Sequence, residues 1–509
     1  MSAKRSGSAK KWSPPGWGGA EIRARFVAFF ESRQHHRLPS SSLIPHDDPT
    51  VLLTTAGMQQ MIPYFLGRTQ PPALRLTSVQ KCFRTTDIDE VGDASHLTFF
   101  EMLGNFSVGD YFKREAIGYA WELLTKGYGL PADRLYPTVH PDDAESPGYW
   151  HEVAGVDPET ITRLNDNWWG PPGESGPCGP DSEIYFDRGV EHGCGNADCA
   201  PGCDRCDRFL EVWNLVFMQY EQAKDGSRTP LKKQNIDTGM GLERLSMVLQ
   251  GKASIYDTDL FRPVIEKFAA LVGTTYGQNP EHDRSLRVIA DHGRALVFLA
   301  ADGVLPGNEG RGYIFRRVLR RAVRHGRLLG IEGPFLAEAA DTVIELFKGH
   351  YAELEQRRQR IIDVLSVEEK KFSETLARGL QLLARELESL KREGSKIVPG
   401  ELAFKLYDTH GFPLELTEEL ANDQGFTVDR IGFDSAMQRQ QETARQAAGF
   451  VRAEEEHIWT SISKSLPPTR FLGYNGTEGS SEILALVVDG SPADAVSAPQ
   501  RVAVVLAET

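Results

Sequence analysis

Residues 98–110 (TFFEMLGNFSVGD) and 237–244 (DTGMGLER) decide the fold class of this 509-residue chain. With Arg84 upstream, the first stretch supplies a guanidinium and aromatic rings, and the second ends in another arginine. In a nucleotide site, one guanidinium group binds the α-phosphate, an aromatic ring stacks on the base, and a second guanidinium group lies near the β- and γ-phosphates. The chain contains no G-x-x-x-x-G-K-[ST] loop, and Gly239-x-Gly241 lacks the third glycine of a dinucleotide fingerprint. The two stretches therefore predict an ATP site of another design.

The wording of these and other phrases resembles the class II aminoacyl-tRNA synthetases, and among them the alanyl-tRNA synthetase family. In class II a strand, loop and strand carry the first arginine and a stacking phenylalanine, and a strand-to-helix turn carries the second arginine. The order of the phrases is the same from about Ala20 to about Val451. They are residues 39–43 (PSSSL), 55–58 (TAGM), 98–110, 176–180 (GPCGP), 211–218 (EVWNLVFM), 237–244, 288–292 (VIADH), 310–313 (GRGY) and 406–413 (LYDTHGFP).

The resemblance implies an α+β fold, with the class II antiparallel sheet flanked by helices, then an all-α domain and the start of a β-rich domain. Helical spacing of Ile22, Phe26 and Phe30 predicts a helix, and residues 51–55 (VLLTT) predict a strand. The expected domains are a disordered tail at 1–18, a catalytic domain at 19–256 with a Cys-rich insert at 192–207, a helical tRNA-recognition domain at 257–465, and the incomplete β-rich start of an editing region at 466–509.

Composition and charge limit the classes of protein. Hydrophobic residues make up 40% and charged residues 25%, as in globular proteins. No apolar run approaches the roughly 18 residues of a membrane span, and the first 19 residues lack the apolar centre of a signal peptide. A cytoplasmic protein without a membrane partner is expected. The net charge of −14 means that any RNA contact must come from a local basic surface.

Such a surface is predicted on a helix that begins near Ile314. At 100° per residue, its apolar side chains fall in one arc and its arginines in another. The arginines are Arg316, Arg317, Arg320, Arg321, Arg324 and Arg327. Beside an ATP site of synthetase type, we expect Arg316 and Arg320 to contact tRNA phosphates. The alternative is a solvated face balanced by carboxylates. A second amphipathic stretch, 352–393, has Gly379 as a possible break.

Four of the six cysteines lie in one short loop: Cys194, Cys199, Cys203 and Cys206. Four thiolates at such spacings predict a tetrahedral, structural Zn2+ site. Two disulfides are the alternative, which a reducing compartment disfavours. His192 could replace one ligand. We expect Cys82 and Cys178 to be small packed residues rather than nucleophiles.

The resemblance also assigns the residues of the ATP site. Arg84 would hold the α-phosphate and the amino acid carboxylate, Phe99 would stack on adenine, and Arg244 would cover its other face or bind the γ-phosphate. Glu101 also belongs to the expected ATP site. Mg2+ should accompany ATP, with Glu211 as a ligand.

The amino acid site implied by the resemblance is small and holds an ammonium group. Asp237 would bind the ammonium, Trp169 and Asn214 would shape the pocket, and Gly239 would leave room for a methyl group. Trp168 could take the place of Trp169. Where members of the family often read Gly-Pro-Cys-Gly-Pro-Cys, this chain has Asp181 as the last residue, which weakens any claim that this segment binds a metal.

The resemblance implies ATP, L-alanine and tRNA(Ala) as partners and a possible homo-oligomer. The G·U pair of the tRNA acceptor stem would be read by Asn308 and Asp408. The family's editing site contains a His-x3-His pair, which the 13 histidines here do not form. Two alternatives stay open: a non-catalytic fragment that binds tRNA or zinc, and a class II synthetase for another amino acid such as glycine or serine.

Overall fold

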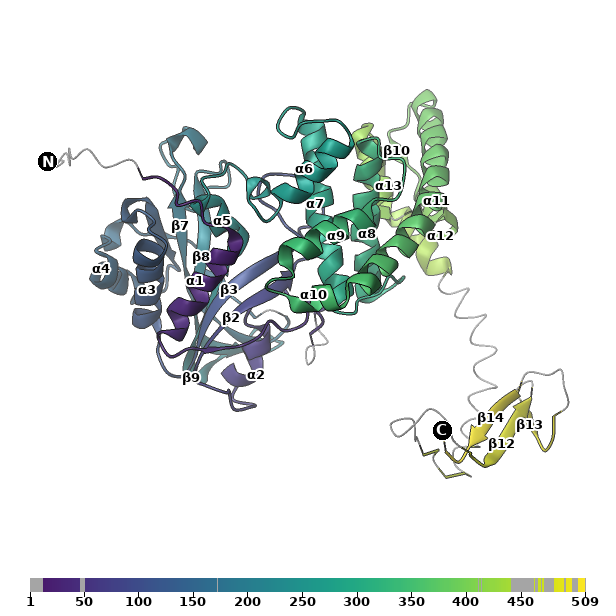
Figure 1. The fold of residues 1–509 in the computed structure, drawn as a ribbon, viewed down its shortest axis with the longest axis horizontal. Helices are drawn as coiled ribbons and strands as arrows, with labels where there is room; N and C mark the ends of the chain where they lie inside the picture. The colour runs from purple at the N-terminus through teal and green to yellow at the C-terminus, as the bar shows by residue number, and fades with distance from the viewer. Residues whose placement is uncertain are drawn as a thin grey trace. The chain divides into compact units, whose positions relative to one another are not determined.

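Residues 36–241 form a nine-stranded sheet in the order β1-β2-β3-β9-β8-β7-β4-β5, with β6 paired to β7. Figure 1 labels its long strands β2, β3, β7, β8 and β9. The terminal pairs β1–β2 and β4–β5 are parallel, and the long pairs from β2 to β7 are antiparallel. The strands are β1 (His36–Arg37), β2 (Arg75–Phe83), β3 (Phe99–Val108), β4 (Leu135–Val139), β5 (Thr162–Arg163), β6 (Trp168–Trp169), β7 (Gly176–Asp187), β8 (Phe209–Gln222) and β9 (Arg228–Gly241).

This computed structural model describes residues 12–45, 51–171, 173–410, 412, 414–440, 462, 466–467, 469–470, 480–488, 491–496 and 502–508. The chain forms two compact units, residues 1–374 and 375–509. The sheet and the helices up to α10 belong to the first unit, so the predicted boundary between residues 256 and 257 falls inside it. That boundary stays a prediction.

The strand register brings the phrases of the sequence together. Met102 on β3 lies opposite Gly241 on β9, and Asn214 on β8 lies opposite Gly239 on β9. Directly opposite residues share a face of the sheet. Because the two stretches that predicted the ATP site run on neighbouring strands, β3 and β9, the expected antiparallel sheet is confirmed as the frame of the site.

The first helix agrees with its prediction, but the strand predicted after it does not form. Helix α1 (Gly19–Glu31) buries Ile22, Phe26 and Phe30. Residues 51–55 are irregular, because they do not pair along a single neighbouring strand. The Thr54 N–H donates to the Leu43 carbonyl, and the Thr54 carbonyl accepts from the Phe83 N–H on β2.

The expected disordered tail also needs revision. Residues 1–11 lie outside the described residues. The described part, 12–18, is packed onto the fold: Trp12 donates to the Gly129 carbonyl, and the Arg25 guanidinium lies 3.8 Å from the ring centre of Trp17.

Helix α7 (Pro280–Ala301) is buried along most of its length. Its N-terminus is set by Asn279, whose side chain accepts from the N–H groups of Glu281 and His282, and by Pro280 at the first helical position. Other helices of the first unit are α2 (Ile62–Phe65), α3 (Lys113–Glu122), α4 (Ser146–Ala154), α5 (Leu242–Leu249), α6 (Arg262–Leu271), α8 (Gly310–Leu328), α9 (Leu336–Phe347) and α10 (Ala352–Gln356).

Helix α11 (Arg358–Arg392) runs without interruption through Gly379, where the sequence suggested a break. Gly379 serves packing instead. A Cβ atom at this position would come within 2.5 Å of the Phe412 ring, so the glycine lets that ring approach the helix backbone.

The second unit contains short helices and two small sheets. Helices α12 (Gly400–His410) and α13 (Leu414–Asp423) accompany a parallel pair, β10 (Ile397–Val398) with β11 (Thr427–Val428). Strands β12 (Ile483–Val488), β13 (Ser491–Ala493) and β14 (Val502–Leu506) form an antiparallel sheet. The strand-like character predicted near the end of the chain is confirmed. Among the described helices, none is both long and apolar enough to cross a membrane.

Candidate active site

A cavity of about 120 Å³ opens where β3, β8 and β9 meet the loop between β2 and β3. Both predicted arginines border it: Arg84 from the end of β2, and Arg244 from the first turn of α5. The remaining lining residues are Asp87, Ser95, His96, Leu97, Phe100, Met102, Glu211, Val212, Gly239, Gly241 and Glu243. Two guanidinium groups on one cavity suit a polyphosphate ligand.

The aromatic ring in this cavity is Phe100, so the assignment of Phe99 is corrected. Side chains alternate along β3, and Phe99 lies on the opposite face, fully buried and stacked on Phe298 of α7 with 4.2 Å between ring centres. Phe100 lines the cavity, and the Arg84 guanidinium lies 4.9 Å from its ring centre. A base entering the cavity would therefore meet Phe100.

Glu101 shares the buried face of β3 with Phe99 and does not line the cavity. Its carboxylate is fully buried and accepts two hydrogen bonds from Arg23, at 2.8 and 2.5 Å, and one from the Tyr351 hydroxyl at 2.8 Å. The positive charge of Arg23 holds the pKa of Glu101 below its usual value although burial alone would raise it. Glu101 connects α1 to the sheet and to the segment before α10, which corrects its assignment to the ATP site.

Two buried residues that the sequence did not point to, Glu243 and Arg294, hold the strand and the helix turn beside the cavity in place. Glu243 accepts the N–H of Glu101 and a 2.7 Å bond from Arg294 of α7, and the same guanidinium donates to the Phe99 carbonyl at 2.5 Å. Both side chains are almost fully buried. The sequence could have pointed to Glu243, because it precedes Arg244 at the end of residues 237–244. Arg244 lines the cavity, whereas Glu243 binds Arg294 and the Glu101 N–H.

Arg244 is held beside the cavity by Glu211 of β8. The Nη1–Oε2 distance is 2.8 Å, and both side chains keep about a third of their surface in solvent. Burial alone would lower the pKa of Arg244, but the charge of Glu211 raises it above its usual value. The pair keeps a fully charged, partly accessible guanidinium ready for phosphate. The predicted Mg2+ ligand thus also orients the second arginine.

Asp237 lies on β9 with only 5% of its surface exposed. Within the described chain, its Oδ1 atom has no hydrogen-bond partner. Burial, with the nearby charge of Asp181, raises the pKa of Asp237 to about 8. Burying a carboxylate with an unpaired oxygen is unfavourable, so the site is built for a cationic partner that the free protein does not supply.

Carboxylates on β7 extend this acidic region. Asp181 and Glu183 lie on the same face as Asp237, and burial raises their pKa values to about 7 and about 8. Asn214 stands between them, donating to Asp181 at 3.2 Å. Because the three acids are buried close together, they hold protons at a higher pH than exposed carboxyl groups do, and a neighbouring cation would favour their ionised forms.

The structure chooses between the two candidate tryptophans. Trp169 packs against the apolar cluster that contains Val216, which lies opposite Asp237. Trp168 faces elsewhere, with its ring 5.9 Å from Tyr220 and 4.1 Å from the Arg228 guanidinium carbon. Of the two rings, Trp169 is therefore the one that packs against the Val216 cluster, and its role in an amino acid site stays a prediction.

Gly239 lies against the side chain of Met102. A Cβ atom there would lie 2.8 Å from the Met102 sulfur, so a larger residue would displace the methionine. Both residues line the cavity, and the room that Gly239 is expected to leave for a substrate methyl group stays a prediction.

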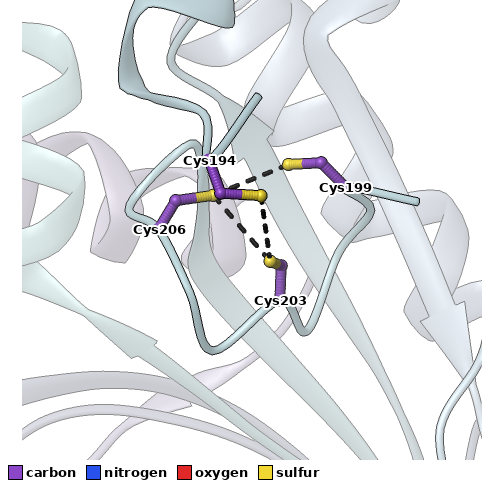
Figure 2. Close-up of side chains that lie close together, drawn as sticks. All are labelled: Cys194, Cys199, Cys203 and Cys206. Atoms are coloured by element: carbon purple, nitrogen blue, oxygen red, sulfur yellow. Dashed lines mark hydrogen bonds between the residues drawn. The ribbon is translucent and has the colours of Figure 1, made fainter. Parts of the chain in front are cut away.

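The four cysteines of the β7–β8 loop come together in space (Figure 2). Their sulfur atoms all lie within 4.8 Å of one another, and all six cysteines of the chain are free thiols, so the disulfide alternative is not formed. Hydrogen bonding from the Asn196 backbone lowers the pKa of Cys194 to about 7. Four thiols at these distances fit a single tetrahedral metal ion. Cys82 and Cys178 are buried, as predicted.

The cysteine loop lies close to the side of the cavity that Glu211 and Arg244 line. Cys203 and Cys206 border a second cavity, of about 330 Å³, which shares Glu211 and Arg244 with the first. Arg208, the residue before β8, binds Asp187, the last residue of β7, through two hydrogen bonds of 2.9 and 2.8 Å. This pair joins the two ends of the loop.

The arginine face predicted on α8 is wrong as an exposed surface. The apolar arc is buried as expected, but Arg321 and Arg324 are buried too. Arg316 binds Glu368 at 2.7 Å, and Arg320 lies 4.0 Å from the same carboxylate and 5.2 Å from the Phe372 ring centre. Each of these two side chains keeps 15% of its surface exposed. As they lie, these arginines serve the packing of α8.

The other predicted tRNA contacts are accessible. Asn308 is exposed in the loop before α8, where its side-chain oxygen accepts from Arg316. Asp408 is exposed on α12. They belong to different units of the chain.

A sheet that carries two arginines, an aromatic ring and a buried acid in this order is the site of a class II aminoacyl-tRNA synthetase. The family described as "tRNA synthetases class II (A)" matches residues 21–509, and the chain belongs to this family.

Among its relatives are three proteins named alanine–tRNA ligase. The one from Dehalococcoides mccartyi is 49% identical over 96% of this chain, that from Carboxydothermus hydrogenoformans 49% over 94%, and that from Rubrobacter xylanophilus 51% over 92%. The chain covers 54 to 56% of the length of these relatives. Among solved structures, a pyrrolysyl-tRNA synthetase from Desulfitobacterium hafniense matches 47% of this chain and 71% of its own at 12% identity, with a TM-score of 0.28.

Proposed function

We propose that this chain activates alanine with ATP and transfers it to the 3′ end of tRNA(Ala), as an alanine–tRNA ligase. The observation that carries the proposal is the buried carboxylate of Asp237, with an unpartnered oxygen, two residues along β9 from Gly239, which lines the cavity bordered by Arg84 and Arg244. An ammonium group satisfies the acid, and the two guanidinium groups match the charges of ATP. The relatives named alanine–tRNA ligase support the choice of alanine.

In the first step, an oxygen of the alanine carboxylate attacks the α-phosphorus of ATP. The bond from that phosphorus to the bridging oxygen breaks, and pyrophosphate leaves with the electron pair. Arg84 holds the α-phosphate and the carboxylate, Arg244 binds the phosphates beyond, and Phe100 stacks on adenine. Such a reaction needs positioning and charge neutralisation rather than a protein nucleophile.

In the second step, a ribose hydroxyl at the tRNA 3′ end attacks the carbonyl carbon of alanyl-adenylate. The bond to the phosphate oxygen breaks, AMP leaves, and the hydroxyl proton passes to a phosphate oxygen or to water. Asn308 and Asp408 would recognise the acceptor stem, since an amide and a carboxylate can accept from the guanine amine of a G·U pair.

Two metals belong to this proposal. Glu211 would help to hold Mg2+, which neutralises charge on the ATP phosphates. The four cysteines of the β7–β8 loop would hold a structural Zn2+, since four thiolates leave no open coordination position. The chain would act in the cytoplasm.

Amino-acid-dependent exchange of pyrophosphate into ATP, run across all twenty amino acids, tests the proposal. We expect exchange with alanine, and weaker exchange with serine and glycine, because a small pocket cannot firmly reject either. A chain that binds tRNA but shows no exchange with any amino acid would be a non-catalytic module. Exchange led by glycine or serine would assign another specificity.

A further inference from the structure

We infer that Asp181 is a positioning residue for the amino acid: its buried carboxylate fixes the orientation of the Asn214 amide, so that the amide oxygen faces the substrate ammonium. This inference rests on the proposed function, because it concerns the group that binds beside Asp237.

Asp181 is buried, and both of its carboxylate oxygens accept hydrogen bonds from protein side chains. Only 1% of its surface is exposed, and its N–H donates to the Asn167 carbonyl at 2.9 Å. Its Oδ1 accepts from the Asn167 side-chain amide at 2.8 Å, and its Oδ2 accepts from Nδ2 of Asn214 at 3.2 Å. Asn167, the residue before β6, thus binds one carboxylate oxygen of Asp181, and Asn214 binds the other.

The chemistry of these groups determines which end of the amide faces where. A side-chain amide has one donating end and one accepting end, whereas an ionised carboxylate only accepts. Burial raises the pKa of Asp181, but the hydrogen bonds from Asn167 and Asn214 to its two oxygens act in the opposite direction and favour the ionised form. Toward ionised Asp181, Asn214 must turn its donating end. The second neighbour of the same nitrogen is also a carboxyl oxygen, Oε1 of Glu183 at 3.5 Å. The Asn214 oxygen is left on the other side.

That oxygen and the acid oxygen of Asp237 share one property. Both Asn214 Oδ1 and Asp237 Oδ1 are buried without a hydrogen-bond partner in the part of the chain that the structure describes. The two residues are diagonal neighbours on β8 and β9, since Asn214 lies opposite Gly239 and Val216 lies opposite Asp237. Two unsatisfied acceptors suit a ligand with several donors, and an ammonium group has three.

The first test is Asp181→Asn, which keeps the shape but lets residue 181 present either an oxygen or an N–H group to Asn214. The orientation of Asn214 is then no longer fixed. We expect the KM for alanine in pyrophosphate exchange to rise about tenfold, the effect of about one hydrogen bond, with kcat and the KM for ATP changed less than about twofold. Calorimetric titration with L-alanine alone should show the same loss of affinity.

The second test exchanges the two side chains. In the double variant Asp181→Asn with Asn214→Asp, Asn at 181 can accept from Asn167 and donate to the carboxylate at 214, whose other oxygen still faces the ammonium. Asn214→Asp alone sets two carboxylates against each other. The double variant should therefore bind alanine at least about tenfold more tightly than the product of the single effects predicts. Additive effects would overturn the inference.

Asp143→Asn is the matched control, because Asp143 is a buried carboxylate that binds Lys113 and Ser146 outside the site. It should lower the melting temperature and leave the KM for alanine unchanged. If Asp181→Asn melts below the assay temperature, the double variant is compared with Asn214→Asp alone and should bind alanine at least about tenfold more tightly, because it restores the pair; equal affinities would overturn the inference. Wild-type chain without alanine exchange would count against the proposed function; active wild type with an unchanged KM in Asp181→Asn would count against Asp181 alone.

Discussion

At the scale of single residues, the pair Phe99-Phe100 shows what a sequence can and cannot decide. The resemblance predicts a strand that carries a stacking phenylalanine, and alternation along β3 places the two rings on opposite faces. Which face meets the cavity depends on α7, whose Phe298 covers Phe99 from almost 200 residues away. The same long-range packing explains why Glu101 is a structural acid. Arg84 and Arg244 line the cavity, whereas the roles of Asn214 and Asp237 stay predictions.

The first prediction separates the two rings. Phe100→Ala removes a partly buried ring from the cavity and should raise the KM for ATP about tenfold, the worth of a stacking contact, with little change in stability. Phe99→Ala empties a fully buried site and should lower the free energy of unfolding by about 3 kcal/mol or more. Exchange kinetics and thermal melts on both variants check this. Greater ATP weakening in folded Phe99→Ala than in Phe100→Ala would restore the original assignment.

The second prediction concerns Asp237 and pH. Its pKa of about 8 exceeds that of an unfolded aspartate, so the folded state holds a proton that the unfolded state has already lost. Stability from this group is therefore present in acid and is lost as pH rises from about 4 through about 8. Asp237→Asn should remove that loss. The free energy of unfolding of the variant relative to wild type should therefore be higher at pH 9 than at pH 5 by about 4 kcal/mol, roughly 1.4 kcal/mol for each pH unit between 5 and 8.

The same variant should lose alanine-dependent exchange, because the neutral amide cannot pair with the ammonium. Wild-type kcat/KM for alanine should rise with pH toward about 8, as Asp237 ionises. Exchange that survives in Asp237→Asn, or a melting difference that does not change with pH, would show that the acid does not have the role proposed for it.

At the scale of elements, helical periodicity predicted α1, α8 and the long α11, and it predicted their apolar faces. It could not predict what meets the polar faces. The arginines of α8 bind Asp89 from the β2–β3 loop and Glu368 from α11, which are partners distant in the sequence. Gly379 likewise read as a break because its packing against Phe412 is not visible in the sequence. The cysteine cluster was predictable because all four ligands lie within one loop.

The third prediction tests that loop as an element. Protein purified under reducing conditions with zinc supplied should contain about one Zn2+ per chain, since four thiolates saturate a tetrahedral ion. Cys203→Ser should lose the metal and lower the melting temperature more than it lowers alanine exchange, because Arg208 and Asp187 still hold the base of the loop.

His192→Ala is the control for the cysteine loop, since His192 is outside the four-sulfur group. This variant should keep the zinc and the wild-type melting temperature. Metal analysis by atomic emission decides between the outcomes. Zinc-free wild type, or equal metal loss in both variants, would contradict a four-cysteine site.

At the scale of the whole molecule, the residues proposed for activation and one of the proposed tRNA contacts lie on separate compact units. The cavity, Asp237 and the cysteine loop all lie within residues 1–374, whereas Asp408 lies within 375–509. The sequence predicted a sheet followed by helices and a β-rich end, and all three are present. The position of the division, inside α11, could not be predicted, because a continuous helix has no sequence signal where one unit meets the next.

The fourth prediction follows from this division. Asp408→Ala removes an exposed carboxylate from α12 and should leave alanine-dependent pyrophosphate exchange within about twofold of wild type, because no residue of the second unit lines the described cavity. Aminoacylation of a G·U acceptor stem should fall at least about tenfold, a typical loss when one hydrogen bond to a base edge is removed. A stem with G·C should be charged poorly by both proteins, because its guanine amine is already paired. Glu401→Ala, another carboxylate of α12, is the matched control and should change neither step. If both steps fall together in a folded Asp408→Ala protein, or if wild type charges G·C and G·U stems equally, Asp408 does not read the wobble pair.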